Sequence, residues 1–172
     1  MKMIYSLIIL CFVITCTPKE KDRSVPELIY ESKEYQEPVL TIKDEGVAIW
    51  NIYVDKLSDN KYEVRFKAII KDKWHIYAIN LPSEEGPLPT AFEFNLTPQI
   101  ELIGQVKEGS AIKTFDHNFG VDVMYFEKET VFIQLVNLMQ SEAKLKGNIS
   151  YMACDDERCI PPVDVPFEIT LK

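Results

Sequence analysis

The sequence predicts an all-β domain with an immunoglobulin-like β-sandwich fold of about nine strands. Short runs rich in β-branched and aromatic residues follow one another after Pro38, separated by turn-forming stretches such as SDN, SEEGPLP and KEGS. Apolar and polar residues alternate along many of these runs, as a half-buried strand requires. No stretch after residue 16 carries a helical stripe of about ten or more residues.

The expected strands follow one another along the chain with short gaps. They are residues 47–54, 62–70, 74–81, 91–96, 100–106, 121–126, 130–138, 146–154 and 166–171. The first is apolar on nearly both faces. In the second, Tyr62, Val64, Phe66, Ala68 and Ile70 alternate mostly with charged residues, which predicts one buried face.

The N-terminal segment has the pattern of an export signal. A basic Lys2 precedes an apolar run of about 11 residues, which is too short for a membrane-spanning helix of about 20. Residues 1–15 are therefore expected to be a signal peptide, residues 16–37 a lipidated cysteine and flexible tether, and residues 38–172 the folded domain. Cleavage before Cys16 removes Lys2 and takes the net charge from −8 to −9.

Cys16 stands where a bacterial lipoprotein signal places its acylated cysteine. The sequence before it is Val13-Ile14-Thr15, whereas such signals usually have Leu at the first of these positions and Gly, Ala or Ser at the last. Lipidation of Cys16 is the expected outcome, and an uncleaved anchor or a plain cleaved signal are the alternatives. Each reading places the domain outside the cytoplasm, where disulfides persist.

The composition excludes some classes of function. A net charge of −8 disfavours binding to nucleic acid, which needs clustered Lys and Arg. No serine-histidine-aspartate order, carboxylate pair or phosphate-binding loop supports hydrolytic chemistry. We expect no cofactor and no resident metal.

Cys154 and Cys159 remain as the free pair of the four cysteines. A strand leads into Cys154 and a four-residue polar turn separates it from Cys159, so the two strands should lie about 5 Å apart and permit a disulfide. Three uses stay open at this point. The bond could serve thiol–disulfide exchange, it could staple the hairpin, or the thiolates could bind metal with Met152, His75 or His117.

The residues between the cysteines bear on their reactivity. Asp155, Asp156 and Glu157 disfavour a thiolate, whereas Arg158 favours it. With three acidic residues and one basic residue beside them, the cysteines are not expected to form a strongly activated nucleophile. They are better suited to a disulfide that a reduced partner attacks.

The segment YMACDDERCIPP, beginning at Tyr151, resembles the N-terminal periplasmic domain of the thiol:disulfide interchange protein DsbD. That family carries a Tyr-x-x-Cys…Cys-x-Pro-Pro signature. Two further segments are similar to it. The run ending His75-Ile76-Tyr77 resembles the strand beside the cysteines. The run Asp116, His117, Asn118, Phe119, Gly120 resembles the cap loop, which folds an aromatic side chain over the disulfide.

The resemblance implies a function and partners. The domain would take reducing equivalents from a membrane-embedded, DsbD-like donor and pass them to thioredoxin-like proteins. Cys154 and Cys159 would carry the exchange, with partner thiolates attacking Cys159. An immunoglobulin-like binding or structural lipoprotein with a stapling disulfide is the alternative.

Three positions depart from the family pattern. The spacing between the cysteines is C-x₄-C, one residue shorter than in the best-known members. Asn118 stands where the capping Phe is usual, so the cap aromatic falls at Phe119, and His117 replaces an acidic residue. His117 could therefore exchange a proton near neutral pH.

Overall fold

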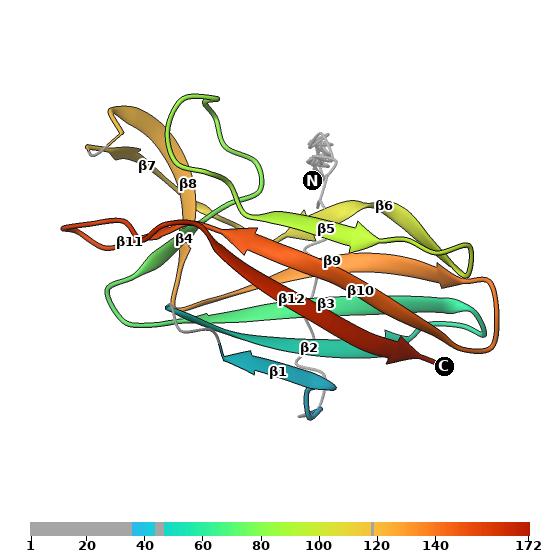
Figure 1. The fold of residues 1–172 in the computed structure, drawn as a ribbon. Coiled ribbons are helices and arrows are strands. Elements are labelled where there is room, and N and C mark those ends of the chain that lie inside the picture. The colour runs from blue at the N-terminus through green and yellow to red at the C-terminus, as the bar shows by residue number, and fades with distance from the viewer. Residues whose placement is uncertain (1–35, 44–46, 118) are drawn as a thin grey trace, which may run out of the picture. The chain divides into compact units, whose positions relative to one another are not determined.

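The longest alternating stretches of the sequence form the main sheet. The structure is a computed structural model that describes residues 36–43, 47–117 and 119–172 (Figure 1). Five antiparallel strands lie in the order β1-β2-β3-β9-β6. Their bounds are β1 Leu40–Lys43, β2 Ala48–Lys56, β3 Lys61–Ile70, β6 Ile100–Glu108 and β9 Glu129–Leu138.

A second sheet covers one face of the first, with the strand order β12-β10-β5. Its strands are β5 Ala91–Asn95, β10 Ala143–Tyr151 and β12 Val163–Leu171. Aromatic rings from the two sheets meet in the core, where the centroids of Phe66 and Phe167 are 5.1 Å apart and those of Trp50 and Phe92 are 6.3 Å apart. This confirms the predicted all-β sandwich, with a core of interleaved inward-facing side chains.

A third, smaller sheet positions the two cysteines. Its order is β11-β4-β8-β7, with β4 His75–Tyr77, β7 Ile112–Asp116, β8 Val121–Glu127 and β11 Ala153–Cys154 (Figure 1). Because side chains alternate along a strand, one face of this sheet carries Ile76, Phe126 and Ala153 into the core. The opposite face carries His75 and Cys154, which are cross-strand partners.

The described residues form twelve strands, more than the nine expected from the sequence. β1 and β7 were not expected. Every residue of β7 except its last is exposed, so its sequence lacks the apolar alternation that marks a half-buried strand. The expected strand 146–154 is divided into β10 and β11, and the expected strand 74–81 has the regular ladder only over β4.

Several expectations fall outside the described residues. The signal peptide, Cys16, most of the tether and Asn118 lie there. Within the described ranges, no helix is long and apolar enough to cross a membrane.

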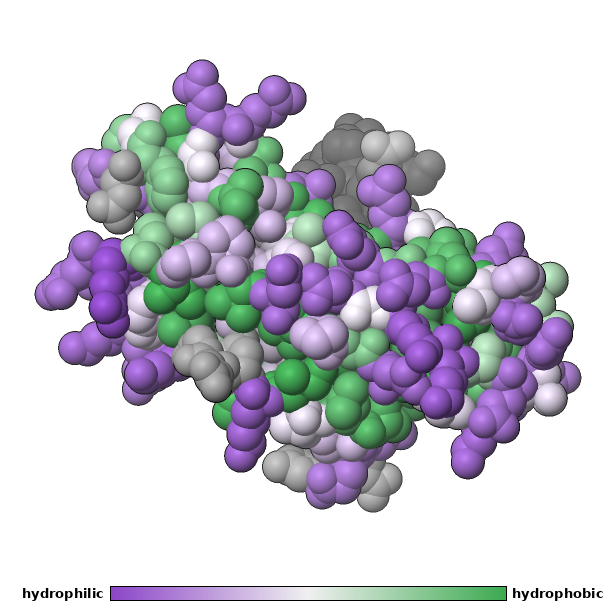
Figure 2. Space-filling view, viewed as in Figure 1, coloured by the Kyte–Doolittle hydropathy of each residue, from purple (hydrophilic) through white to green (hydrophobic). Residues whose placement is uncertain are grey.

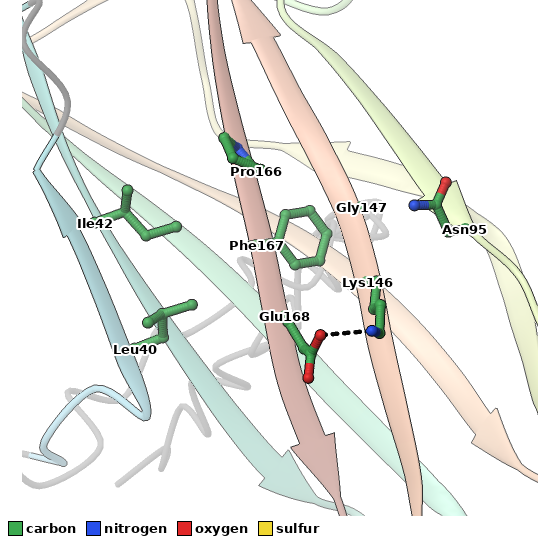
Figure 3. Close-up of a pocket in the computed structure, with 8 residues that line it drawn as sticks. All are labelled: Leu40, Ile42, Asn95, Lys146, Gly147, Pro166, Phe167 and Glu168. Carbon is green, nitrogen blue, oxygen red and sulfur yellow. Dashed lines mark ion pairs between the residues drawn. The ribbon is translucent and has the colours of Figure 1, made fainter.

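A shallow groove lies where the edges of the two large sheets approach each other. Leu40 and Ile42 of β1 face Phe167 of β12 across it, and the ion pair of Lys146 with Glu168 lies beside it (Figure 3). None of its lining residues belongs to the third sheet. In the space-filling view, hydrophobic surface is interspersed with hydrophilic side chains over this side of the domain (Figure 2).

Candidate functional site

Cys154 and Cys159 form a disulfide across the hairpin turn that follows β11. Two backbone hydrogen bonds flank the pair, from Asp155 N to Arg158 O at 2.9 Å and from Ile160 N to Ala153 O at 2.9 Å. The cysteines therefore occupy a non-hydrogen-bonded position of the ladder, where Cα atoms approach most closely. Their Cα atoms are 4.0 Å apart, closer than the sequence-based expectation, because that expectation did not distinguish the two kinds of pair.

The side chain of Asp155 holds this turn. Its Oδ1 accepts hydrogen bonds from the backbone N–H groups of Glu157 at 2.9 Å and Arg158 at 2.8 Å. These bonds to the ionised form lower the pKa of Asp155 below its ordinary value. Asp155 thus has a structural role in the turn, in addition to the electrostatic effect on the cysteines that the sequence suggested.

Arg158 is placed against an aromatic ring. Its guanidinium lies 5.8 Å from the ring centroid of Trp74, the residue that precedes β4. A cation over an indole face is attracted by the ring quadrupole. This contact ties the tip of the turn to the β4 side of the sheet.

The two sulfur-bearing residues differ in their exposure. Cys154 is 0% exposed, whereas Cys159 is partly exposed. An attacking thiolate must approach a disulfide sulfur directly, and access decides which sulfur it reaches. Cys159 is therefore the more accessible residue of the pair and Cys154 the enclosed one.

Tyr77 lies over the buried cysteine. Its hydroxyl is 3.1 Å from Cys154 Sγ and 3.0 Å from Asp116 Oδ2 at the end of β7. Burial, followed by the hydrogen bond to Asp116, raises the pKa of Tyr77 above its ordinary value of 10.0. The hydroxyl is therefore protonated at neutral pH and has one hydrogen to donate, either to the carboxylate or to the sulfur.

His75 contacts the same hydroxyl. Its Nε2 lies 3.3 Å from Tyr77 Oη, and its ring centroid is 4.7 Å from that of Tyr125 on β8. Burial lowers the pKa of His75 below 6.5, although nearby carboxylates act in the opposite direction. The Tyr77 hydroxyl is thus a junction between a buried sulfur, a carboxylate and an imidazole.

The expected cap loop is placed beside this junction. Asp116 Oδ1 accepts a hydrogen bond from Phe119 N at 3.3 Å, and Gly120 N donates to Asp116 O at 2.7 Å. Gly120 has φ 72°, a conformation that glycine adopts without steric cost. The Phe119 ring stands perpendicular to that of Tyr77 with centroids 6.2 Å apart, and Phe119 packs on the apolar cluster that contains Cys154.

The loop 78–90, between β4 and β5, supports the cap from its other side. A Cβ at Gly86 would lie 2.9 Å from Val121 Cγ2 and 3.9 Å from Phe119 Cβ, so the loop backbone packs closely against the cap loop and the start of β8. Glu108 holds the start of the loop by accepting from Ile79 N at 2.7 Å. The buried Thr90 hydroxyl holds its end by donating to Tyr77 O at 2.6 Å.

Two expected flanking residues lie elsewhere. His117 is exposed and its ring packs edge-on against Phe115, with centroids 5.2 Å apart. Tyr151 is buried in the main core, 5.7 Å from Trp50 between centroids, because its side chain points to the core face of the sandwich. Among the described residues, no group of three or more His, Cys, Asp or Glu side chains is placed to hold a metal ion.

Sequence reasoning missed several residues that surround the disulfide. Val121 and Val123 pack around Tyr77 and Cys154, Tyr125 packs on His75, and Gly86 and Glu108 place the supporting loop. The alternation of Val121, Val123 and Tyr125 along β8 was a usable signal, since it puts all three on the face opposite Phe126. Gly86 and Glu108 fall in the turn-forming stretches SEEGPLP and KEGS, but nothing in those stretches indicated which residues they contact.

Solved structures show which known proteins have this fold. The N-terminal domain of DsbD from Neisseria meningitidis in its reduced form matches with a TM-score of 0.50 and 18% identity, covering 76% of this chain and 93% of that one. The N-terminal periplasmic domain of ScsB from Proteus mirabilis matches with a TM-score of 0.55 and 17% identity, covering 76% of this chain and 49% of that one. At these identities the likeness concerns the fold.

Comparison of the sequence with family models identifies its family, whereas comparison with curated proteins finds no match. The matching model describes the N-terminal part of the thiol:disulfide interchange protein DsbD and covers residues 45–170, including both cysteines of the hairpin and all residues around Tyr77. Since the match spans most of the 172 residues, the chain belongs to the family of DsbD N-terminal domains.

Proposed function

We propose that this domain exchanges disulfides with thioredoxin-like proteins through Cys154 and Cys159. The observation that carries the proposal is the unequal burial of the pair at the tip of a hairpin, with Cys154 enclosed and Cys159 partly exposed. Membership of the DsbD N-terminal family supports the same chemistry. The domain carries reducing equivalents as a dithiol and returns to the disulfide after passing them on.

The chemical step begins at Cys159. A partner thiolate attacks Cys159 Sγ, a partner–Cys159 disulfide forms, and the Cys154–Cys159 bond breaks with its electron pair leaving on Cys154 Sγ. The second cysteine thiolate of the partner then attacks the partner sulfur of the mixed disulfide. The bond to Cys159 breaks, and Cys159 leaves as a thiolate. The products are the oxidised partner and the reduced domain, and the reverse sequence passes the two electrons to a recipient.

The structure provides for the charge that develops on Cys154. The Tyr77 hydroxyl, 3.1 Å away, turns its hydrogen from Asp116 to the sulfur as the bond breaks. A hydrogen bond to a charged acceptor is about twice as strong as a neutral one. Phe119 and the loop 78–90 limit access until a partner displaces the cap.

The expected export and lipidation complete the proposal. Acylation of Cys16 would hold the domain at a membrane facing the periplasm, with residues 16–37 as the tether. A tether raises the effective concentration of the domain near a membrane-embedded donor. The donor would be a DsbD-like transmembrane protein, and the recipients would be soluble or anchored thioredoxin-like proteins of the cell envelope.

Trapping a mixed disulfide tests the proposal. In a Cys154→Ala variant, Cys159 has no intramolecular partner. Its thiolate should displace thionitrobenzoate from the remaining cysteine of a thioredoxin-like protein that lacks its resolving cysteine and carries this leaving group, and so form a stable mixed disulfide. In the matched Cys159→Ala variant, the enclosed Cys154 should form far less. Equal trapping by both variants, or no exchange by the unmodified pair, would refute the proposal.

The alternative is a stapled hairpin in a binding or structural lipoprotein. The loop closed by residues 154 and 159 is so short that its closure contributes only about 2 kcal/mol in the chain-entropy treatment. The turn is already held by Asp155 and by its backbone ladder, which leaves less for the disulfide to stabilise. A reduction potential below about −300 mV would favour the staple, and a higher potential favours exchange.

A further inference from the structure

We propose that His75 is the proton donor for the Cys154 thiolate, acting through the Tyr77 hydroxyl, and that it makes opening of the disulfide faster in acid. The inference rests on the proposed function and adds its regulation by pH. The observation behind it is a row of three atoms. Tyr77 Oη lies 3.1 Å from Cys154 Sγ and 3.3 Å from His75 Nε2.

The burial of these residues requires such a route. Cys154 and Tyr77 are each 0% exposed, so water does not reach the leaving sulfur directly. His75 and Asp116 are the two partners of the Tyr77 hydroxyl that are partly exposed. A carboxylate only accepts hydrogen bonds and has no proton to supply, whereas an imidazolium donates from both nitrogens. His75 is therefore the group at this junction that can deliver a proton from solvent.

Opening of the disulfide moves two protons along this chain of atoms. When the partner thiolate opens the disulfide, Cys154 leaves as a thiolate. The Tyr77 hydrogen passes to Cys154 Sγ while the Nε2 hydrogen of the imidazolium passes to Tyr77 Oη, which leaves a thiol, an intact tyrosine and a neutral imidazole. Solvent then restores the proton to His75. In the reverse direction, neutral His75 accepts the proton when the Cys154 thiol attacks a mixed disulfide.

The surroundings of His75 set the pH at which this operates. Its own strand contributes Tyr77, β8 contributes Glu127 as the cross-strand partner and Tyr125 as a ring neighbour, β7 contributes Asp116, and the turn after β11 contributes Asp155 and Asp156. The four carboxylates favour the imidazolium, but burial outweighs them and keeps the pKa of His75 below 6.5. At neutral pH most of the imidazole is therefore neutral and suited to accept a proton.

The pH profile of reduction by dithiothreitol tests the inference on the full chain. The rate constant, expressed per dithiothreitol thiolate, should rise about a hundredfold as the pH falls from about 8 to 5, as positioned proton transfer provides. His75→Gln should abolish the rise. His117→Gln is the matched control, because the chain has only 2 histidines, and it should retain the rise.

Tyr77→Phe separates transfer through the hydroxyl from a simple effect of charge. In this variant His75 still titrates, which proton NMR of the imidazole can verify, but the acid enhancement should disappear. Retention of the enhancement in Tyr77→Phe, or its persistence in His75→Gln, would overturn the inference. Because dithiothreitol replaces the protein partner, these results stand apart from the trapping experiment, and failure of trapping alone would refute only the exchange with thioredoxin-like proteins.

Discussion

The Tyr77 hydroxyl lies 3.1 Å from Cys154 Sγ, although 77 residues separate the two in the sequence. The pairing of β4 with β11 creates this contact, since it places His75 opposite Cys154 and Tyr77 on the same face. An oxygen donor is thereby directed at the one sulfur of the disulfide that is enclosed.

Replacement of Tyr77 by Phe should slow opening of the disulfide at every pH. The variant keeps the ring and loses a hydrogen bond to a developing thiolate, a contribution of about 1.5–3 kcal/mol, so the rate near pH 8 should fall about tenfold to a hundredfold, and the loss should grow toward pH 5 as the acid enhancement disappears. The pKa of the Cys154 thiol in the reduced protein should rise, as alkylation rates against pH would show. Tyr125→Phe is the control. It also removes a tyrosine hydroxyl near the site and keeps the ring that packs on His75, and it should change the rate little.

Replacement of Phe119 by Ala should increase the reactivity of the disulfide toward small thiols several-fold. Phe119 packs on the cluster of Tyr77 and Cys154, so its removal exposes the sulfurs. Phe115→Ala is the matched control in the same hairpin, since that ring is 50% exposed and Phe115 lies on β7 directly before the cap loop. Reaction rates with glutathione measure the effect, and equal acceleration in both variants would contradict a capping role for Phe119.

Replacement of Gly86 by Ala should loosen the cap from the side of the loop 78–90. The new Cβ would meet Val121 Cγ2 at 2.9 Å, and φ at this position is +130°, where non-glycine residues are strained by about 1–3 kcal/mol. Thermal unfolding should shift downward and the rate of reduction by small thiols should rise.

Gly104→Ala provides the control for Gly86→Ala. Gly104 also has a positive φ, at +70°, but a Cβ there meets nothing within 4 Å. This variant should lose stability from backbone strain alone and keep the ordinary rate of reduction. If both variants accelerate reduction to the same degree, general loosening of the domain explains the effect and the loop 78–90 has no specific role.

The turn between the cysteines should open in acid. Because the folded state lowers the pKa of Asp155 below 3.8, its contribution is fully present above that pH and is lost as the pH falls through the lower folded value. The backbone N–H groups of Glu157 and Arg158 donate hydrogen bonds to the Asp155 carboxylate, so their amide hydrogen exchange should show this loss of protection. Asp155→Asn can still accept both bonds and should remove the pH dependence, whereas Asp155→Ala should lower protection at every pH.

The sequence contained enough to predict the fold and to place the two cysteines of the hairpin together. Alternation such as that of residues 62–70 gives a half-buried strand in any context, because side chains of a strand point to opposite faces. The short spacing of Cys154 and Cys159 confines them to one turn, so their disulfide needed no knowledge of distant strands. β7 was not predicted, because an exposed edge strand carries no alternation of apolar and polar residues.

Only the tertiary structure decided how the two cysteines differ and what surrounds them. The residues of the turn do not distinguish Cys154 from Cys159, and the expectation that partners attack Cys159 came from the family resemblance. Strand pairing encloses Cys154 under Tyr77 and leaves Cys159 partly exposed. The approach of Gly86 to the cap and the placement of His75 beside the Tyr77 hydroxyl likewise depend on contacts between separate strands and loops. Periodicity and spacing are local properties of a chain, whereas access to a sulfur and the path of a proton are set by packing between distant segments.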